Sequence, residues 1–129
     1  MQTVKSSSAH GETLSRLLDA IARRGLTMFA QIDHAGAARE VGMELPNEVV
    51  VLFGNPRGGT PLMQQDPRIG FELPLRILVW DHGDDTNVGF KDLRSLSDVY
   101  DVPGQAATLE AMSSLLDQLA NEAAQTQPA

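Results

Sequence analysis

The chain has no cysteine among its 129 residues. Without thiols it can form no disulfide, no thiolate nucleophile, no zinc finger and no cysteine-ligated iron–sulfur cluster. This single absence removes more chemistry than any motif in the sequence, so a functional site must be built from other groups.

Long apolar runs are also absent. No window approaches the roughly 18 apolar residues that a membrane helix needs. The opening segment MQTVKSSSAHGETL has neither a basic start nor an apolar signal core. We therefore expect no membrane partner and a cytoplasmic location.

Cations are missing from the last part of the chain, because Arg94 is the final one. The acidic residues Asp98, Asp101, Glu110, Asp117 and Glu122 follow it, and the net charge of the chain is −7. The basic residues form no stripe with interleaved aromatics. Since such a surface repels phosphate backbones, we expect no nucleic-acid partner.

What is present fits one globular domain. Of the residues, 42% are hydrophobic and 21% are charged, an ordinary balance for a soluble protein. We expect a single domain over 1–124 and a disordered tail over 125–129. His10 is expected at the surface of the first helical turn.

The apolar periodicity predicts helices and strands interleaved around one mixed sheet. Strands are expected at 2–6, 27–32, 48–54, 75–82 and 86–91. Helices are expected from Ser8 to the residue before Gly25, at 34–41, 92–100 and 105–124, with one or two turns at 60–65 that Thr60 caps. This order of elements is typical of an α+β domain.

Three segments together resemble one known family. They are GLTMFAQIDHA at Gly25–Ala35, LFGNPRGGTPLM at Leu52–Met63 and LPLRILVWD at Leu73–Asp81. In this order and at these distances they are similar to the domain of unknown function 302 family. The resemblance runs from the first helix to the hairpin.

The resemblance implies an α+β fold like that of the TATA-binding protein, with a curved, mostly antiparallel sheet and helices packed on it. It also implies a homodimer, and it implies no established reaction. A fold shared with a DNA-binding protein is no evidence of DNA binding, since function depends on the site rather than on the fold.

Asp33 and His34 form the first candidate site, at a junction between a strand and a helix. The helix N-terminus favours a carboxylate and disfavours a charged histidine, and a neutral imidazole can act as a base. The pair is thus a candidate for catalysis. The alternative is that Asp33 only caps the helix and His34 packs in its first turn.

The turn Gly54–Thr60 is the second candidate. Its backbone N–H groups beside Arg57 would hold a carboxylate or phosphate, and the predicted ligand-binding residues are Asn55, Arg57, Gly58, Gly59 and Thr60, joined by His34. The glycine spacing fits neither a P-loop nor a dinucleotide-binding turn. The alternative is a tight crossover between core elements.

A third group lies where a strand ends, at Trp80-Asp81-His82, with Asp84 and Asp85 beyond. Strand alternation predicts Trp80 and His82 on one face of the sheet and Asp81 on the other. An aspartate-rich hairpin turn explains this segment better than a metal cluster does. We expect no metal and no cofactor.

Three functions follow from these observations. The first is a dimeric domain that binds or senses a small anionic or amphipathic ligand. The second is a small hydrolase or isomerase with Asp33 and His34 as an oriented base. The third is a protein–protein interaction module.

Overall fold

The computed structural model describes residues 1–125, and residues 126–129, most of the predicted tail, lie outside the described part. Five strands form one sheet: β1 (Gln2–Lys5), β2 (Thr27–Asp33), β3 (Glu48–Gly54), β4 (Leu75–His82) and β5 (Asp85–Phe90). The α-helices are α1 (His10–Arg23), α2 (His34–Glu40), α3 (Pro56–Gln65) and α4 (Ala106–Ala124), and two 3₁₀ helices are η1 (Pro67–Phe71) and η2 (Arg94–Asp98).

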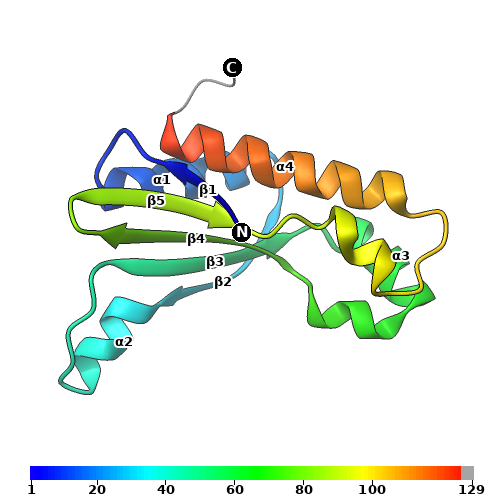
Figure 1. Ribbon diagram of the computed structural model, residues 1–129, viewed down its shortest axis with the longest axis horizontal. Coiled ribbons are helices and arrows are strands. Elements are labelled where there is room, and N and C mark those ends of the chain that lie inside the picture. Colours follow the sequence, from blue (N-terminus) through cyan, green and yellow to red (C-terminus); the bar gives the residue numbers. More distant parts are fainter. Residues whose placement is uncertain (126–129) are drawn as a thin grey trace.

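All pairs of neighbouring strands are antiparallel, in the order β1-β5-β4-β3-β2. The predicted α+β fold, an antiparallel sheet with helices packed on it, is confirmed. The strands of residues 1–125 form no parallel pair, so the sheet is not mixed as expected. In Figure 1, α1 and α4 lie on the same side of the sheet. No helix within residues 1–125 is long and apolar enough to cross a membrane.

The core lies between the sheet and these two helices. The buried side of the sheet is formed by alternate residues of the three inner strands, for example Val51 and Phe53 of β3 and Ile77 of β4. Leu17 of α1 and Leu116 of α4 pack against them. The unbroken apolar run of β3 therefore serves a central strand, because β2 and β4 flank it on both sides.

The other face of the sheet is less covered. Alternation places Val50, Leu52, Leu78 and Trp80 there, half-buried, and the neighbouring Ile32 is 44% exposed. Trp80 lies so close to Gly89 of the next strand that a Cβ atom on Gly89 would be 2.8 Å from the ring. Trp80 thus shields a glycine in the sheet, and we call this surface the open face.

The predicted turn at 54–60 is wrong in one respect, because α3 starts at Pro56, four residues before Thr60. Asn55 is the N-cap, and its Oδ1 accepts a hydrogen bond from the Arg57 N–H at 3.0 Å. Pro56 then occupies the first turn, where a missing N–H costs nothing. Gly58 and Gly59 are consequently helical, and Pro61 lies inside the helix.

The segment after α3 is held by Asp66, a carboxylate with only 5% of its surface exposed. It accepts hydrogen bonds from Arg68 Nε at 3.0 Å, from Arg68 Nη2 at 2.8 Å and from the Asp101 N–H at 2.9 Å. The side-chain bonds from Arg68, then the Asp101 N–H, hold the pKa of this carboxyl well below its usual range. Asp66 therefore connects η1 to the loop before α4.

We expect this carboxylate to make folding sensitive to acid. Because its pKa is lowered by folding, its stabilisation is complete above the unfolded-state pKa of about 3.9 and is lost as the pH falls below that value. The thermal midpoint measured between pH 7 and pH 2.5 should fall less in Asp66→Asn than in the parent protein. The exposed Asp98→Asn protein is the control, and an identical fall in all three would contradict the role of Asp66.

Candidate functional site

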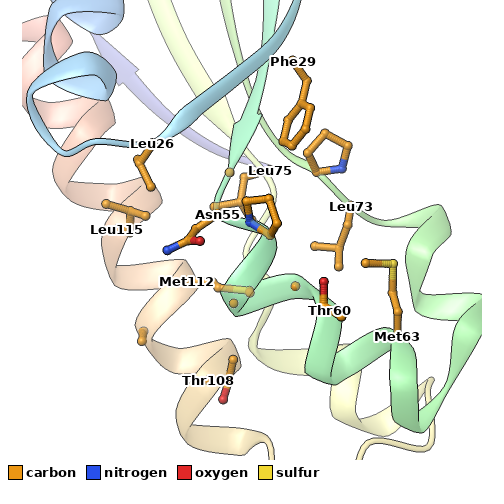
Figure 2. Close-up of a pocket in the computed structure, with 16 residues that line it drawn as sticks. Leu26, Phe29, Asn55, Thr60, Met63, Leu73, Leu75, Thr108, Met112 and Leu115 are labelled. Atoms are coloured by element: carbon orange, nitrogen blue, oxygen red, sulfur yellow. The ribbon is translucent and has the colours of Figure 1, made fainter.

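A cavity of about 520 Å³ opens between α3, α4 and the ends of β2, β3 and β4 (Figure 2). It lies at the point where the predicted ligand-binding turn meets α4. Its walls are formed by Leu26, Phe29, Gly54, Asn55, Pro56, Gly58, Gly59, Thr60, Met63, Leu73, Pro74, Leu75, Thr108, Ala111, Met112 and Leu115.

A β-bulge supplies one wall of this cavity. The pairing of β2 with β3 shifts register between Met28 and Ala30, which leaves Phe29 as an extra residue. Phe29 lies against Gly54, where a Cβ atom would be 3.8 Å from its ring. The bulge is therefore the local feature that adds an aromatic ring to the cavity wall.

Small residues make the space on the α3 side. A Cβ atom on Gly58 would lie 3.6 Å from Met112 Cε, and one on Gly59 would lie 3.4 Å from Leu73 Cδ1. Both are ordinary contact distances, and both glycines have helical backbone angles. The two glycines are thus not needed for the backbone of the helix, and their effect is to leave volume open.

None of the residues in 1–125 that line the cavity is charged. The polar side chains are Asn55, Thr60 and Thr108. The Thr108 hydroxyl is already paired with Gln105 Oε1 at 2.7 Å. The cavity is therefore apolar, with the free polar groups confined to its α3 side.

The predicted anion-binding donors are occupied within the protein. The Gly58 and Gly59 N–H groups donate to the Asn55 carbonyl at 2.9 and 3.1 Å, and the Arg57 N–H donates to the Asn55 side chain. Arg57 itself is exposed and does not line the cavity. Of the six predicted ligand-binding residues, Asn55, Gly58, Gly59 and Thr60 meet at the cavity.

His34 is not brought to this place. It begins α2 at the end of β2 that pairs with the start of β3, whereas Asn55 follows the end of β3. The Asp33 side chain accepts a hydrogen bond from the Gly36 N–H at 2.9 Å, as expected for an N-cap. Both Asp33 and His34 are exposed, and catalysis by this pair stays a prediction.

A polar cluster around Asp81 was not predicted from the sequence, because His10 was expected at the surface. Its side chain is only 11% exposed, and Nδ1 lies 3.8 Å from Asp81 Oδ1. Asp81 accepts hydrogen bonds from Thr86 Oγ1 at 2.6 Å and from Asn47 Nδ2 at 3.1 Å. The His–x₇₀–Asp separation gives no local signal, so only the packing of α1 against β4 reveals the contact.

The end of β4 follows the predicted alternation. Asp81 points to the side of α1, and Trp80 lies on the open face. Gly83 and Asp84 form the turn, with Gly83 in the left-handed region at φ 60°. Within residues 1–125, no group of three or more histidine or acidic side chains is arranged to hold a metal ion.

The fold and this cavity define an α+β domain with an apolar pocket at one end of its sheet. The family described as "Domain of unknown function DUF302" matches residues 2–123, and the chain belongs to that family. The resemblance found in the sequence is thereby confirmed.

A solved structure shares the fold. It is the crystal structure of an uncharacterized conserved DUF302 protein from Bacillus stearothermophilus, with a TM-score of 0.83 and 19% identity, and the match covers 95% of this chain and 96% of that one. At this identity the likeness shows the fold alone.

Two curated relatives have a functional name. The proteins called fluoride-specific ion channel FluC 1 of Brucella suis and of Brucella abortus are each 40% identical to this chain over 81 residues, or 63% of its length. The match covers 32% and 30% of those proteins. The chain thus spans about a third of the length of the relatives that it matches.

Proposed function

We propose that this protein binds a small, largely apolar molecule in the cavity between α3 and α4. The observation that carries the proposal is the combination of about 520 Å³ of space with walls whose described residues bear no charge. Ligand pockets commonly enclose about 300–1,000 Å³ and are lined by apolar groups with a few polar ones. The anionic ligand expected from the sequence has less support, because the N–H groups of the turn are already paired.

Titration with the neutral fluorescent probe N-phenyl-1-naphthylamine tests this function. We expect saturable enhancement of its emission by the parent protein. Gly58→Leu should lower the affinity by about tenfold or more, since the added side chain would occupy space beside Met112. Circular dichroism would show whether the variant is folded.

Arg57→Ala is the matched control in the same helix. Because Arg57 does not line the cavity, its loss should leave the affinity for the neutral probe unchanged. An equal loss in both variants, or no saturable binding by the parent protein, would contradict the proposal.

We propose in addition that two copies associate through the open face. Leu52, Leu78 and Trp80 lie together there, and Ile32 is exposed beside them. Leu52→Glu should convert a dimer to a monomer in light-scattering measurements, because the carboxylate would be buried without a partner. Gln64→Glu adds the same charge on α3 and should leave the mass unchanged, whereas a parent protein that is monomeric at all concentrations would refute the dimer.

The curated relatives favour a second candidate function, which is regulation of a fluoride channel. Proteins named as fluoride channels contain a stretch similar to this chain. No helix in residues 1–125 is long and apolar enough to span a membrane. Fluoride efflux from vesicles that contain such a channel should change about twofold or more when this protein is added, and an unchanged rate would contradict this candidate.

A further inference from the structure

We infer that the ligand of the cavity is a neutral molecule with an apolar body and one hydrogen-bond acceptor. The Asn55 amide nitrogen donates a hydrogen bond to that acceptor. This inference rests on the proposed function, because it assigns a chemical class to the ligand of the same cavity. Ketones, esters and amides belong to that class.

The orientation of the Asn55 amide is fixed by its role as a cap. Oδ1 accepts a hydrogen bond from the Arg57 N–H at 3.0 Å. Only the oxygen of an amide can accept, so the atom at the other end of the amide is the nitrogen, Nδ2. Within residues 1–125 this nitrogen donates no hydrogen bond. In Figure 2 it points toward α4, where Met112 and Leu115 form the facing wall. An unused donor therefore faces apolar surface.

Thr60 provides a second polar group one turn further along α3. No residue of the described part accepts or donates a hydrogen bond to its hydroxyl, and Figure 2 shows this hydroxyl directed toward the side of Leu73. The Thr108 hydroxyl points the other way and bonds to Gln105. Among the described side chains of the cavity wall, those available to a ligand thus come from α3 and its N-cap.

The position of these groups orients the ligand. Asn55 and Thr60 are exposed, whereas Gly54 and Leu75 are buried, so the donor lies at the mouth and the apolar walls lie deeper. The acceptor group of a ligand that bonds to Asn55 stays near water, while the apolar part of the same ligand is buried away from water. Each buried CH₂ group strengthens such binding about fourfold.

The ligand is neutral because the cavity offers nothing to balance a charge. Among the described residues no cation lines it, and the nearest N–H groups of α3 are paired. A carboxylate transferred to such a place loses its hydration without an ionic partner. The net charge of −7 adds a further repulsion toward anions.

Three compounds of similar size and different chemistry test the inference by displacement of N-phenyl-1-naphthylamine. Butyrophenone carries a ketone, butylbenzene has no acceptor, and phenylbutyrate carries a carboxylate. We expect butyrophenone to displace the probe at a concentration about five- to tenfold lower than either of the others. A net neutral hydrogen bond strengthens binding by about this factor.

Asn55→Asp removes the donor and keeps an oxygen that can cap α3. The advantage of butyrophenone over butylbenzene should disappear in this variant, while displacement by butylbenzene stays the same. Thr60→Val removes the second hydroxyl without touching the cap, and it should reduce the same advantage about twofold to threefold if Thr60 shares the acceptor.

The possible failures are distinguishable. If the probe binds and Gly58→Leu blocks it, but phenylbutyrate displaces it best or the three compounds are equal, the neutral-acceptor inference is overturned and the binding function stands. If the ketone keeps its advantage in Asn55→Asp, Asn55 is not the donor and the inference is overturned, whatever Thr60→Val shows. If the probe does not bind at all, the proposed function itself fails.

Discussion

Replacing both Gly58 and Gly59 by alanine should raise the free energy of unfolding by about 1–2 kcal/mol and at the same time weaken ligand binding. Each glycine costs a helix up to about 1 kcal/mol relative to alanine, and neither has a backbone angle that requires glycine. The added methyl groups would meet Met112 and Leu73 at ordinary contact distances. Stability and binding should therefore change in opposite directions.

Urea denaturation and N-phenyl-1-naphthylamine titration of the same preparations would measure the two effects. We expect a weakening of about threefold to tenfold in the double variant, because two methyl groups reduce the open volume. Gly11→Ala is the matched control, since Gly11 lies in α1 and a Cβ atom there would meet nothing within 4 Å. A double variant that gains stability and keeps full affinity would show that these glycines do not serve the cavity.

Phe53→Ala should lower the free energy of unfolding by about 3–5 kcal/mol, the usual range for an aromatic ring removed from a core. Phe53 is completely buried in the central strand β3, and it is paired with Leu75 on one side and Met28 on the other. The free energy of unfolding of a whole domain is about 5–15 kcal/mol, so this variant should be close to unfolding at room temperature.

Urea unfolding followed by Trp80 fluorescence would give this number. Leu52→Ala, one residue earlier in β3 and on the open face, is the control and should lose about 1–2 kcal/mol, because Leu52 is only half-buried. Equal losses at the two positions would contradict the assignment of the core to the helix-covered side of the sheet.

The sequence predicted those elements in which apolar pattern and local signals agree. The bounds of β3 and β4 were predicted to the residue, because each is a long apolar strand bordered by turn residues. Asp33 was predicted as a cap and is one. In these places burial and local preference favour the same structure.

The helix α3 was misplaced because its local signals disagree. Gly58, Gly59 and Pro61 are typical of a loop, yet Asn55 and Pro56 begin a helix that is anchored by the buried Leu62. The cap at Asn55 could have been inferred from the sequence. The cavity itself could not, since Met112 and Leu115 approach α3 only through the packing of α4 on the sheet.

The bulge at Phe29 has a consequence beyond the cavity. β2 is the last strand of the sheet, and its outer edge has no neighbouring strand among the described residues. A regular free edge can recruit strands from other molecules and start aggregation, and an irregular one resists this. The extra residue that adds an aromatic ring to the cavity wall thus also interrupts the edge. A shortened β2 without Phe29 would pair more evenly, and we expect such a protein to lose its ligand and its solubility together.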